Sequence, residues 1–190
     1  GELDSKFGIN GIIQLGQITV NKDRAIEADY ADALTIDSEG NLYLAGRTRS
    51  DLGEEGVSYD MFVAKFNSKG ELDNSFAVNG VAQLGDDTMG SLADGYEYVT
   101  DIKLTSNNHV VVSGYTDGSL GETNAGSNDG FIAKFTDTGV LDTSFGGGSG
   151  IVQFGSVTAT GSAAAYEIIE DMVLDDSDNI YATGSTEGAF

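Results

Sequence analysis

Repetition is the feature of this chain that most constrains its fold. The motif "ELD" or "VLD" occurs at residues 2–4, 71–73 and 140–142, so successive copies lie 69 residues apart. The octapeptide "YDMFVAKF" at 59–66 returns as "NDGFIAKF" at 128–135 with the same spacing. Two different motifs that share one period indicate a structural unit of about 69 residues, copied along the chain.

A third block shows what the unit contains. "DYADALTIDSEGNLYLAG" at 29–46 matches "EYVTDIKLTSNNHVVVSG" at 97–114 and "EIIEDMVLDDSDNIYATG" at 167–184. Alternating apolar and polar residues predict strands, and the Asx- and Gly-rich links between them predict tight antiparallel turns.

Each repeat therefore has four strand positions, which we call A to D. In the repeat that begins at residue 29, strands are expected at 30–36, 41–46, 61–66 and 81–85. In strand A the alternation predicts that Leu34 and Ile36 point inward. A unit of four antiparallel strands is typical of a β-propeller blade.

The same residues resemble a known family. "DSEGNLYLAG" at 37–46, "DMFVAKF" at 60–66 and "LDTSFG" at 141–146 resemble the bacterial β-propeller repeat called SBBP and its relative, the delta-sixty repeat. The "DFP"-type loop of that family is missing, in line with a chain that has no proline. The resemblance implies a scaffold in a large bacterial surface or secreted protein, more than it implies a chemistry.

The strand positions divide the chain into unequal parts. Residues 1–28 hold a D strand, expected at 11–15; 29–96 and 97–166 each hold A to D; and 167–190 hold A and B. The predicted fold is a single all-β segment of about 2.75 four-stranded blades, an incomplete ring. Propellers typically close with about four to eight blades.

Three explanations for the incomplete ring stay open. The chain is a window on a longer polypeptide, copies of it associate into a ring or filament, or a partner's strand completes the broken blade. The expected partners are accordingly further repeats, copies of the chain, or a complementing strand.

Composition excludes several classes of function. The 31 acidic and 9 basic residues give a net charge of −22, which argues against binding to nucleic acid or anionic lipid. The chain has no cysteine, and its one histidine, His109, has no nucleophile motif near it, so nothing indicates an enzyme. No apolar stretch is long enough to span a membrane.

Acidic residues at repeated positions are the best candidates for a site. Strand A lines the central channel of a propeller, so its carboxylates could form a ring of oxygen ligands for Ca²⁺. The alternative is that they cap turns or face solvent. The candidates are Asp29, Glu97 and Glu167 at one repeat position, with Asp32, Glu170, Asp101 and Asp171 near it.

The other repeated polar residues predict structural roles. Asp4, Asp73 and Asp142 should accept hydrogen bonds from nearby backbone, as should the turns 37–41 and 175–179. Lys65 and Lys134 should either extend a snorkelling stem or pair with a neighbouring carboxylate. Gln14, Gln83 and Gln153 should face outward or bridge to a loop. His109 is expected in a surface turn, and Tyr59, Tyr96 and Tyr166 either stack on sugar rings or are partly buried.

Together these features predict a non-enzymatic structural and interaction module of an extracellular or bacterial surface protein, an adhesin or a filament, with Ca²⁺ as a stabiliser. A carbohydrate-binding propeller is the first alternative, and a propeller hydrolase or lyase is the second. The loops at 47–59, 115–128, 16–29, 85–97 and 155–167 differ most between copies, as expected of a rigid scaffold with variable binding rims.

Overall fold

The computed structural model describes residues 1–14, 29–48, 59–85, 95–121, 123–124, 126–155 and 166–187. These residues form an all-β structure with one short 3₁₀ turn. Its elements are β1 (Asp29–Ile36), β2 (Leu42–Thr48), β3 (Asp60–Phe66), β4 (Val81–Leu84), β5 (Glu97–Leu104), β6 (Val110–Thr116), β7 (Asp129–Phe135), η3 (Gly146–Gly148), β8 (Ile151–Phe154), β9 (Glu167–Leu174) and β10 (Ile180–Thr186).

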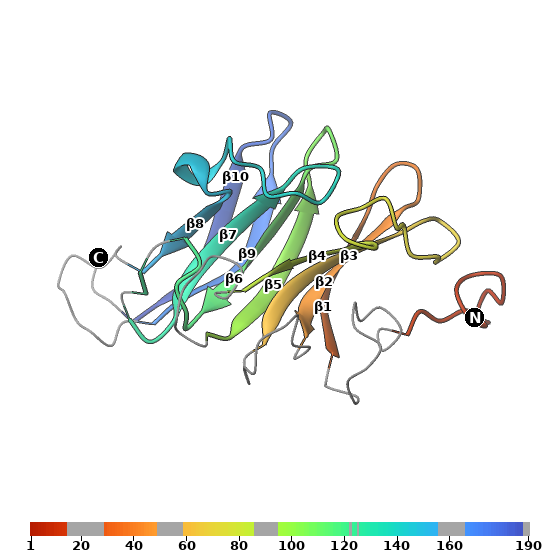
Figure 1. The fold of residues 1–190 in the computed structure, drawn as a ribbon, viewed down its shortest axis with the longest axis horizontal. Coiled ribbons are helices and arrows are strands. Elements are labelled where there is room, and N and C mark those ends of the chain that lie inside the picture. The colour runs from red at the N-terminus through yellow and green to blue at the C-terminus, as the bar shows by residue number, and fades with distance from the viewer. Residues whose placement is uncertain are drawn as a thin grey trace.

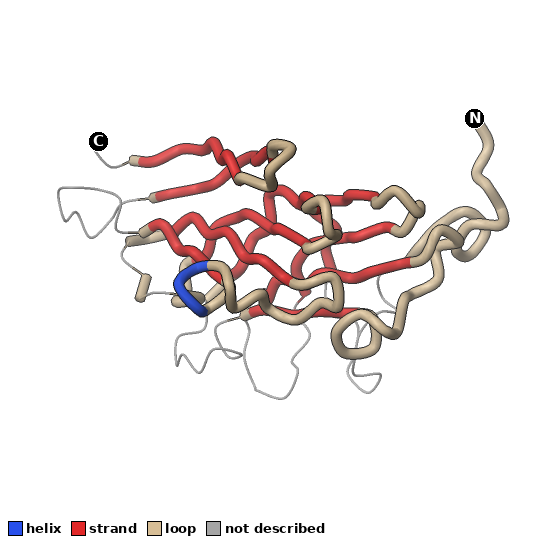
Figure 2. Tube along the Cα trace, turned by 90° about the horizontal axis from the view of Figure 1, so that it is seen from above, coloured by secondary structure: helices blue, strands red, loops and turns tan. Residues whose placement is uncertain are grey.

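The strands form three antiparallel sheets that follow one another along the chain. Strands β1 to β4 make a four-stranded sheet in sequence order, β5 to β8 make a second, and β9 pairs with β10. The sheets lie side by side as successive layers (Figure 1), and Figure 2 shows the layers from above. The two four-stranded sheets have the architecture expected of propeller blades, and the described residues do not close a ring.

A glycine near the end of each B strand allows that strand to approach strand A. The register between the two strands shifts next to this glycine, which is Gly46 in β2, Gly114 in β6 and Gly184 in β10. A Cβ on Gly114 would overlap the carbonyl oxygen of Tyr98 on β5, and the other two glycines face the equivalent carbonyl. The repeated glycine is therefore required by the β-bulge of the A–B hairpin.

The main core lies between the two four-stranded sheets. Tyr43, Met61 and Phe76 of the first repeat pack in one cluster with Phe131 and Phe135 of the second. All five are at most 2% exposed, and burial of each such side chain contributes about 1.5–3 kcal/mol. Period-2 alternation places Tyr43, Met61, Phe131 and Phe135 on the face of each sheet that meets its neighbour, and Phe76 reaches the same cluster from the segment between β3 and β4.

Two smaller clusters cover the other faces. Ile132 on β7 packs with Ile169 and Met172 on β9, and this cluster holds the third sheet against the second. On the opposite face of the first sheet, Phe62 and Phe66 of β3 contact Ile13 of the N-terminal segment.

The strand predicted at 11–15 is not formed within the described residues 1–14. This segment has an isolated bridge between Ile9 and Ile12 instead. In the following repeats strand D pairs with strand C, as β4 does with β3, whereas no described strand pairs with residues 11–14. Without such a ladder among the described strands, residues 11–14 stay outside the sheets.

The N-terminal segment nevertheless occupies the place of a D segment. The amide of Gly8 donates to the carbonyl of Lys69 at 2.8 Å, and the amide of Ala77 donates to Thr138 over the same distance one repeat later. Residues 1–14 lie at the opposite side of the molecule from β10 (Figure 1). This segment therefore contacts the first sheet as the first repeat contacts the second.

The prediction that Leu34 and Ile36 point inward is wrong. They are 61% and 60% exposed, because no described residues cover their face of β1. At the repeat position of Leu34, the second and third sheets have Ile102 and Met172, which are 2% and 1% exposed beneath the preceding sheet. The strand forms where alternation predicts it, but in the first sheet its apolar face has no covering layer among the described residues.

The predicted variable loops lie largely outside the described residues. In the part of the chain that the structure describes, there is no helix with the length and hydrophobicity needed to cross a membrane.

Candidate functional site

Each strand A begins with a carboxylate that accepts a hydrogen bond from the last threonine of strand B. The hydroxyl of Thr116 donates to Glu97 Oε1 at 2.9 Å. The equivalent bonds run from Thr48 to Asp29 at 2.7 Å and from Thr186 to Glu167 at 3.2 Å. These three predicted calcium ligands therefore close the ends of the A–B hairpins.

Two of these acids are buried at the seams between sheets. Glu97 is 0% exposed and Glu167 is 6% exposed. The amide of Glu97 donates to the carbonyl of Tyr59 at 2.8 Å, and the amide of Glu167 donates to Asn128 over the same distance. Each glutamate thus lies beside the start of strand C in the preceding sheet, where Asp129 stands in the second repeat.

The acids that open strand C were not predicted from the sequence. Asp129 is 0% exposed, and its Oδ2 accepts a hydrogen bond from Gln153 Nε2 at 2.8 Å. In the first repeat, Gln83 Nε2 donates to Asp60 Oδ2 over the same distance. The signal was present, because this aspartate occurs in both copies of the repeated octapeptide.

The predicted bridge from a strand D glutamine to a loop is confirmed for Gln153. Its Oε1 accepts the amides of Leu120 and Gly121, at 2.9 and 3.1 Å, and its Nε2 donates to the carbonyl of Gly118 at 3.1 Å. One buried side chain therefore ties strand D to the loop between β6 and β7 and to Asp129.

Burial raises the pKa of Glu167, and the negative charge of Asp129 raises it further. The hydrogen bond from Thr186 acts in the opposite direction and lowers the pKa of Glu167. The net shift is upward, which favours the protonated form of this carboxyl.

Of the four remaining predicted calcium ligands, Asp32 and Glu170 have partners of their own, whereas Asp101 and Asp171 share the amide of Met172. Arg47 forms an ion pair with Asp32 at 2.7 Å, and Ser185 donates to Glu170 at 3.2 Å. The other contacts are Lys103 Nζ to Asp101 Oδ1 at 2.6 Å, Met172 N to Asp101 Oδ2 at 3.1 Å and Met172 N to Asp171 Oδ1 at 2.9 Å.

Asp101 links strand A of the second sheet to strand A of the third. Burial acts to raise the pKa of Asp101, but the hydrogen bonds from Lys103 and from the amides of Met172 and Ile102 together hold it below the ordinary value. An ionised, lysine-paired carboxylate is the form that this contact stabilises.

The described residues contain no group of three or more histidine, cysteine, aspartate or glutamate side chains that could hold a metal ion. The seven candidate acids are thus distributed over hairpin ends and sheet contacts. Calcium binding stays a prediction.

Aromatic rings gather where the A strands begin. The guanidinium of Arg47 lies between two rings, 4.2 Å from the centroid of Tyr30 and 4.9 Å from that of Tyr98. Tyr98 stacks on Tyr115 with centroids 4.8 Å apart. Tyr59 lies 5.8 Å from both Tyr30 and Tyr96. We call these residues the tyrosine–arginine cluster: Tyr30, Arg47, Tyr59, Tyr96, Tyr98 and Tyr115.

The cluster spans the seam between the first two sheets, and its cation–π contacts stabilise that seam. A cation over an aromatic face contributes about 0.5–1 kcal/mol at an exposed site. Tyr30 is 41% exposed. Tyr59, Tyr96 and Tyr166 are half-buried, which agrees with partial burial, one of the two alternatives predicted for them.

The His109 side chain contacts a carboxylate outside the turn in which it was expected. Its Nδ1 lies 3.1 Å from Asp142 Oδ2, and Lys134 Nζ lies 3.3 Å from the same oxygen. The hydrogen bond from the Ser144 hydroxyl, opposed by burial, leads the contacts that hold the pKa of Asp142 well below its usual range. His109 therefore ties strand B to the segment that follows strand C.

The predicted structural role of the "LD" aspartates is confirmed. The amides of Lys6, Ser75 and Ser144 donate to Asp4, Asp73 and Asp142 respectively, at 2.9 to 3.1 Å. Of the two alternatives for the repeated lysines, the ion pair is present: Lys65 Nζ lies 3.4 Å from Asp73 and Lys134 Nζ lies 3.3 Å from Asp142.

The two acidic turns are backbone-bonded, as predicted. Asp37 Oδ1 accepts the amides of Glu39 and Asn41 at 2.9 and 2.8 Å. Asp175 accepts the equivalent amides of Ser177 and Asn179, both at 2.9 Å. These contacts make both segments Asx turns.

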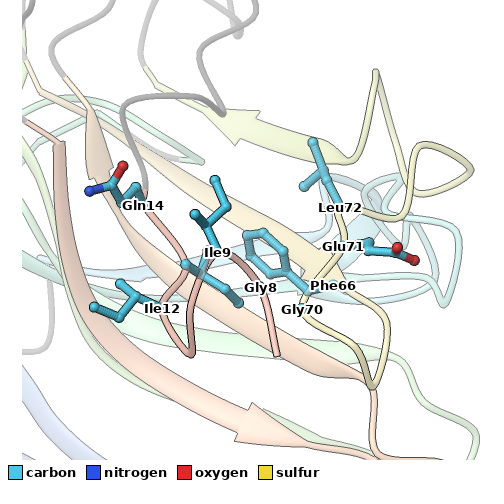
Figure 3. Close-up of a pocket in the computed structure, with 9 residues that line it drawn as sticks. Gly8, Ile9, Ile12, Gln14, Phe66, Gly70, Glu71 and Leu72 are labelled. Atoms are coloured by element: carbon cyan, nitrogen blue, oxygen red, sulfur yellow. The ribbon is translucent and has the colours of Figure 1, made fainter. Parts of the chain in front are cut away.

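A cavity of about 290 Å³ lies between the N-terminal segment and the first sheet. Figure 3 shows the side chains of Ile9 and Phe66 side by side within it, with Ile12 and Leu72 on either side. Gln14 is exposed at the rim of the cavity, in agreement with the alternative that this glutamine faces outward. The lining is mainly apolar, and Gln14 and Glu71 are its polar side chains.

Comparison with known proteins supports the architecture. A family model described as "Domain of unknown function (DUF5122) beta-propeller" matches residues 105–145. The chain contains a β-propeller repeat. No curated protein matches the chain.

The matched segment contains much of the repeated structure of the second blade. It runs from the A–B turn through β6 and β7 to Phe145, and includes the bulge glycine Gly114. The contact of His109 and Lys134 with Asp142 lies entirely within it. These features thus belong to the part of the chain that is similar to a propeller family.

Proposed function

We propose that this chain is a non-enzymatic structural and interaction module, with blades of the SBBP or delta-sixty type that continue into further blades. The additional blades come from the same polypeptide or from copies of it. The proposed setting is extracellular, in a bacterial surface protein, an adhesin or a filament, in line with the sequence resemblance.

The exposed face of β1 is the observation that carries this proposal. Leu34 is 61% exposed, whereas the equivalent Ile102 and Met172 are buried beneath a preceding sheet. An apolar side chain at this position is covered in the second and third sheets and exposed in the first. The exposed face of the first sheet is therefore a surface that fits another sheet of the same kind.

The other end of the described structure presents an edge. Among the described strands, β10 pairs only with β9, whereas β2 and β6 each pair on both sides. Val173 and Tyr181 on these two strands are 56% and 57% exposed. An edge strand of this kind is a template for a further strand.

Mass measurement tests the proposal. The chain of residues 1–190 should form assemblies larger than its denatured mass of 19.8 kDa, in a manner that depends on concentration. A monomer at all concentrations up to the millimolar range would argue against blade-to-blade association.

Calcium is part of the proposal as a stabiliser. The net charge of −22 and the repeated acids support it, because divalent cations are effective counter-ions for such a surface. EGTA should lower the melting temperature by several degrees. An unchanged melting temperature would remove Ca²⁺ from the account.

The tyrosine–arginine cluster favours carbohydrate binding as a second candidate function. Aromatic rings with polar edges are suited to sugar rings. In a titration with a panel of oligosaccharides, Tyr30→Ala should weaken any binding, whereas Tyr181→Ala, at the opposite end of the strands, should not. Equal effects of the two substitutions, or no binding, would exclude this cluster as a sugar site.

A further inference from the structure

The first and third sheets expose the two opposite halves of one repeated packing arrangement. Leu34 on the first sheet is 61% exposed, although Met172 at its repeat position is 1% exposed against the preceding sheet. Tyr181 on the third sheet is 57% exposed, although Tyr43 at its repeat position is 1% exposed against the following sheet. Each face therefore lacks, among the described residues, the layer that covers its equivalent.

The two seams within the chain show which repeat positions meet. Tyr43 on β2 lies in one apolar cluster with Ile102 on β5 of the following sheet. At the second seam Val111, which has the repeat position of Tyr43, lies in one cluster with Met172 on β9. The same position of strand B in one sheet therefore meets the same position of strand A in the next sheet at both seams.

We propose that copies of this chain associate head to tail, with the third sheet of one copy packed on the first sheet of the next. Tyr181 of one copy then lies against Leu34 of the other, as their equivalents do at the internal seams. This inference rests on the proposed function and names the partner, which is a second copy of the same chain. The interface is heterologous, because it joins two different faces.

A neighbouring pair of positions also fits this junction. At the second seam Lys103 Nζ lies 4.0 Å from Asp171 Oδ1, so an ion pair joins the two sheets there. The equivalent positions at the proposed junction hold Val173, which is 56% exposed, and Ala33 of the next copy. Because both members of the charged pair are replaced by apolar residues, neither position leaves a buried charge without a partner.

The N-terminal segment of the second copy contributes to the joint blade. Gly8 donates to the carbonyl of Lys69 as Ala77 donates to that of Thr138, so residues 1–14 contact the first sheet as a D segment of a preceding blade does. When the third sheet of another copy covers the first sheet, this segment lies in the D position of the same blade as β9 and β10. The two described strands of the third sheet thus gain a further segment from the second copy.

Charge repulsion opposes this association and gives it a characteristic dependence on salt. Each copy has a net charge of −22, whereas the two faces present Leu34, Ile36, Val173 and Tyr181, all 56% to 61% exposed. The screening length falls from about 10 Å at 0.1 M salt to about 3 Å at 1 M. Assemblies should therefore grow between about 0.1 M and 1 M NaCl. Dissociation over this range would overturn the proposal, because it would indicate a contact built on ion pairs.

Variants that block one face each test the arrangement in sedimentation velocity. Leu34→Glu blocks the face of the first sheet, and Tyr181→Glu blocks the face of the third. Because every head-to-tail contact needs one face of each kind, each variant alone should be a monomer. Their equimolar mixture should form a dimer of about twice 19.8 kDa, since one unblocked contact remains. Val140→Glu, at an exposed site outside both faces, should assemble as the wild type does.

The outcomes separate this inference from the proposed function. If Tyr181→Glu alone assembles to the wild-type extent, the head-to-tail contact is wrong, while association through the first sheet stands. A wild type that stays monomeric would contradict both proposals.

A disulfide gives a second readout, because the chain has no cysteine of its own. With oxidised glutathione as the oxidant, a mixture of Leu34→Cys and Tyr181→Cys should yield the mixed disulfide dimer in excess of either homodimer. An excess of the Leu34→Cys homodimer would overturn the proposal, because two first-sheet faces would then meet.

Discussion

Thr116 donates a hydrogen bond to Glu97 over 2.9 Å, and both side chains are 0% exposed. The Thr116 hydroxyl also accepts the amide of Gly118 at 2.8 Å. This threonine therefore joins the two strands of the A–B hairpin to the loop that follows, at the point where one sheet meets the preceding one.

Thr116→Val should destabilise the chain by about 1.5–3 kcal/mol, the cost of removing a hydrogen bond to a charged or buried carboxyl. Valine has nearly the same shape, so the loss is mainly polar. Chemical denaturation gives the comparison with Thr143→Val at an exposed threonine, which should change the free energy of unfolding by less than about 0.5 kcal/mol. Equal stabilities of the two variants would show that this hydroxyl is dispensable.

Gly114→Ala should cost more than about 3 kcal/mol, because its Cβ would overlap the carbonyl oxygen of Tyr98 and neither backbone can move without breaking the sheet. Gly147→Ala separates overlap from backbone strain. Gly147 has φ of +68° and open space around it, so alanine there should cost only about 1–2 kcal/mol. A Gly114→Ala cost no larger than the Gly147→Ala cost would contradict the close approach.

Asp142 should make the second blade sensitive to acid. Its pKa lies below the ordinary 3.8, chiefly through Ser144 against the opposing effect of burial. The stability that it provides is thus present above pH 3.8 and is lost as the pH falls through the lower folded-state pKa.

In thermal unfolding below pH 3.8, Asp142→Asn should show a shallower fall in melting temperature than the wild type. Asp137→Asn, at an exposed aspartate on the adjacent turn, should keep the wild-type slope. Parallel curves for wild type and Asp142→Asn would exclude this carboxylate as the acid-sensitive group.

Much of the strand pattern can be predicted from the sequence, because alternation and turn chemistry are local. Strands expected at 30–36 and 61–66 extend over 29–36 and 60–66. The strand at 11–15 could not be excluded in this way, since a D strand needs a C strand as its partner.

The contacts of the site were harder to predict, because they join residues distant in sequence or at unlike repeat positions. His109 contacts Asp142 across 33 residues. Arg47 lies where Tyr115 stands in the next repeat, so the tyrosine–arginine cluster has no repeated motif. The burial of Glu97 depends on the sheet packed beside it, which alternation along one strand does not specify.

The most direct test of blade-to-blade association compares two surface substitutions of equal exposure. Leu34 on β1 and Val140 on the β7–β8 turn are both 61% exposed. In sedimentation velocity of residues 1–190, Leu34→Glu should shift the assemblies toward monomer, and Val140→Glu should leave them unchanged. Association that persists in Leu34→Glu to the same extent as in Val140→Glu would contradict the proposal that the face of β1 receives another blade.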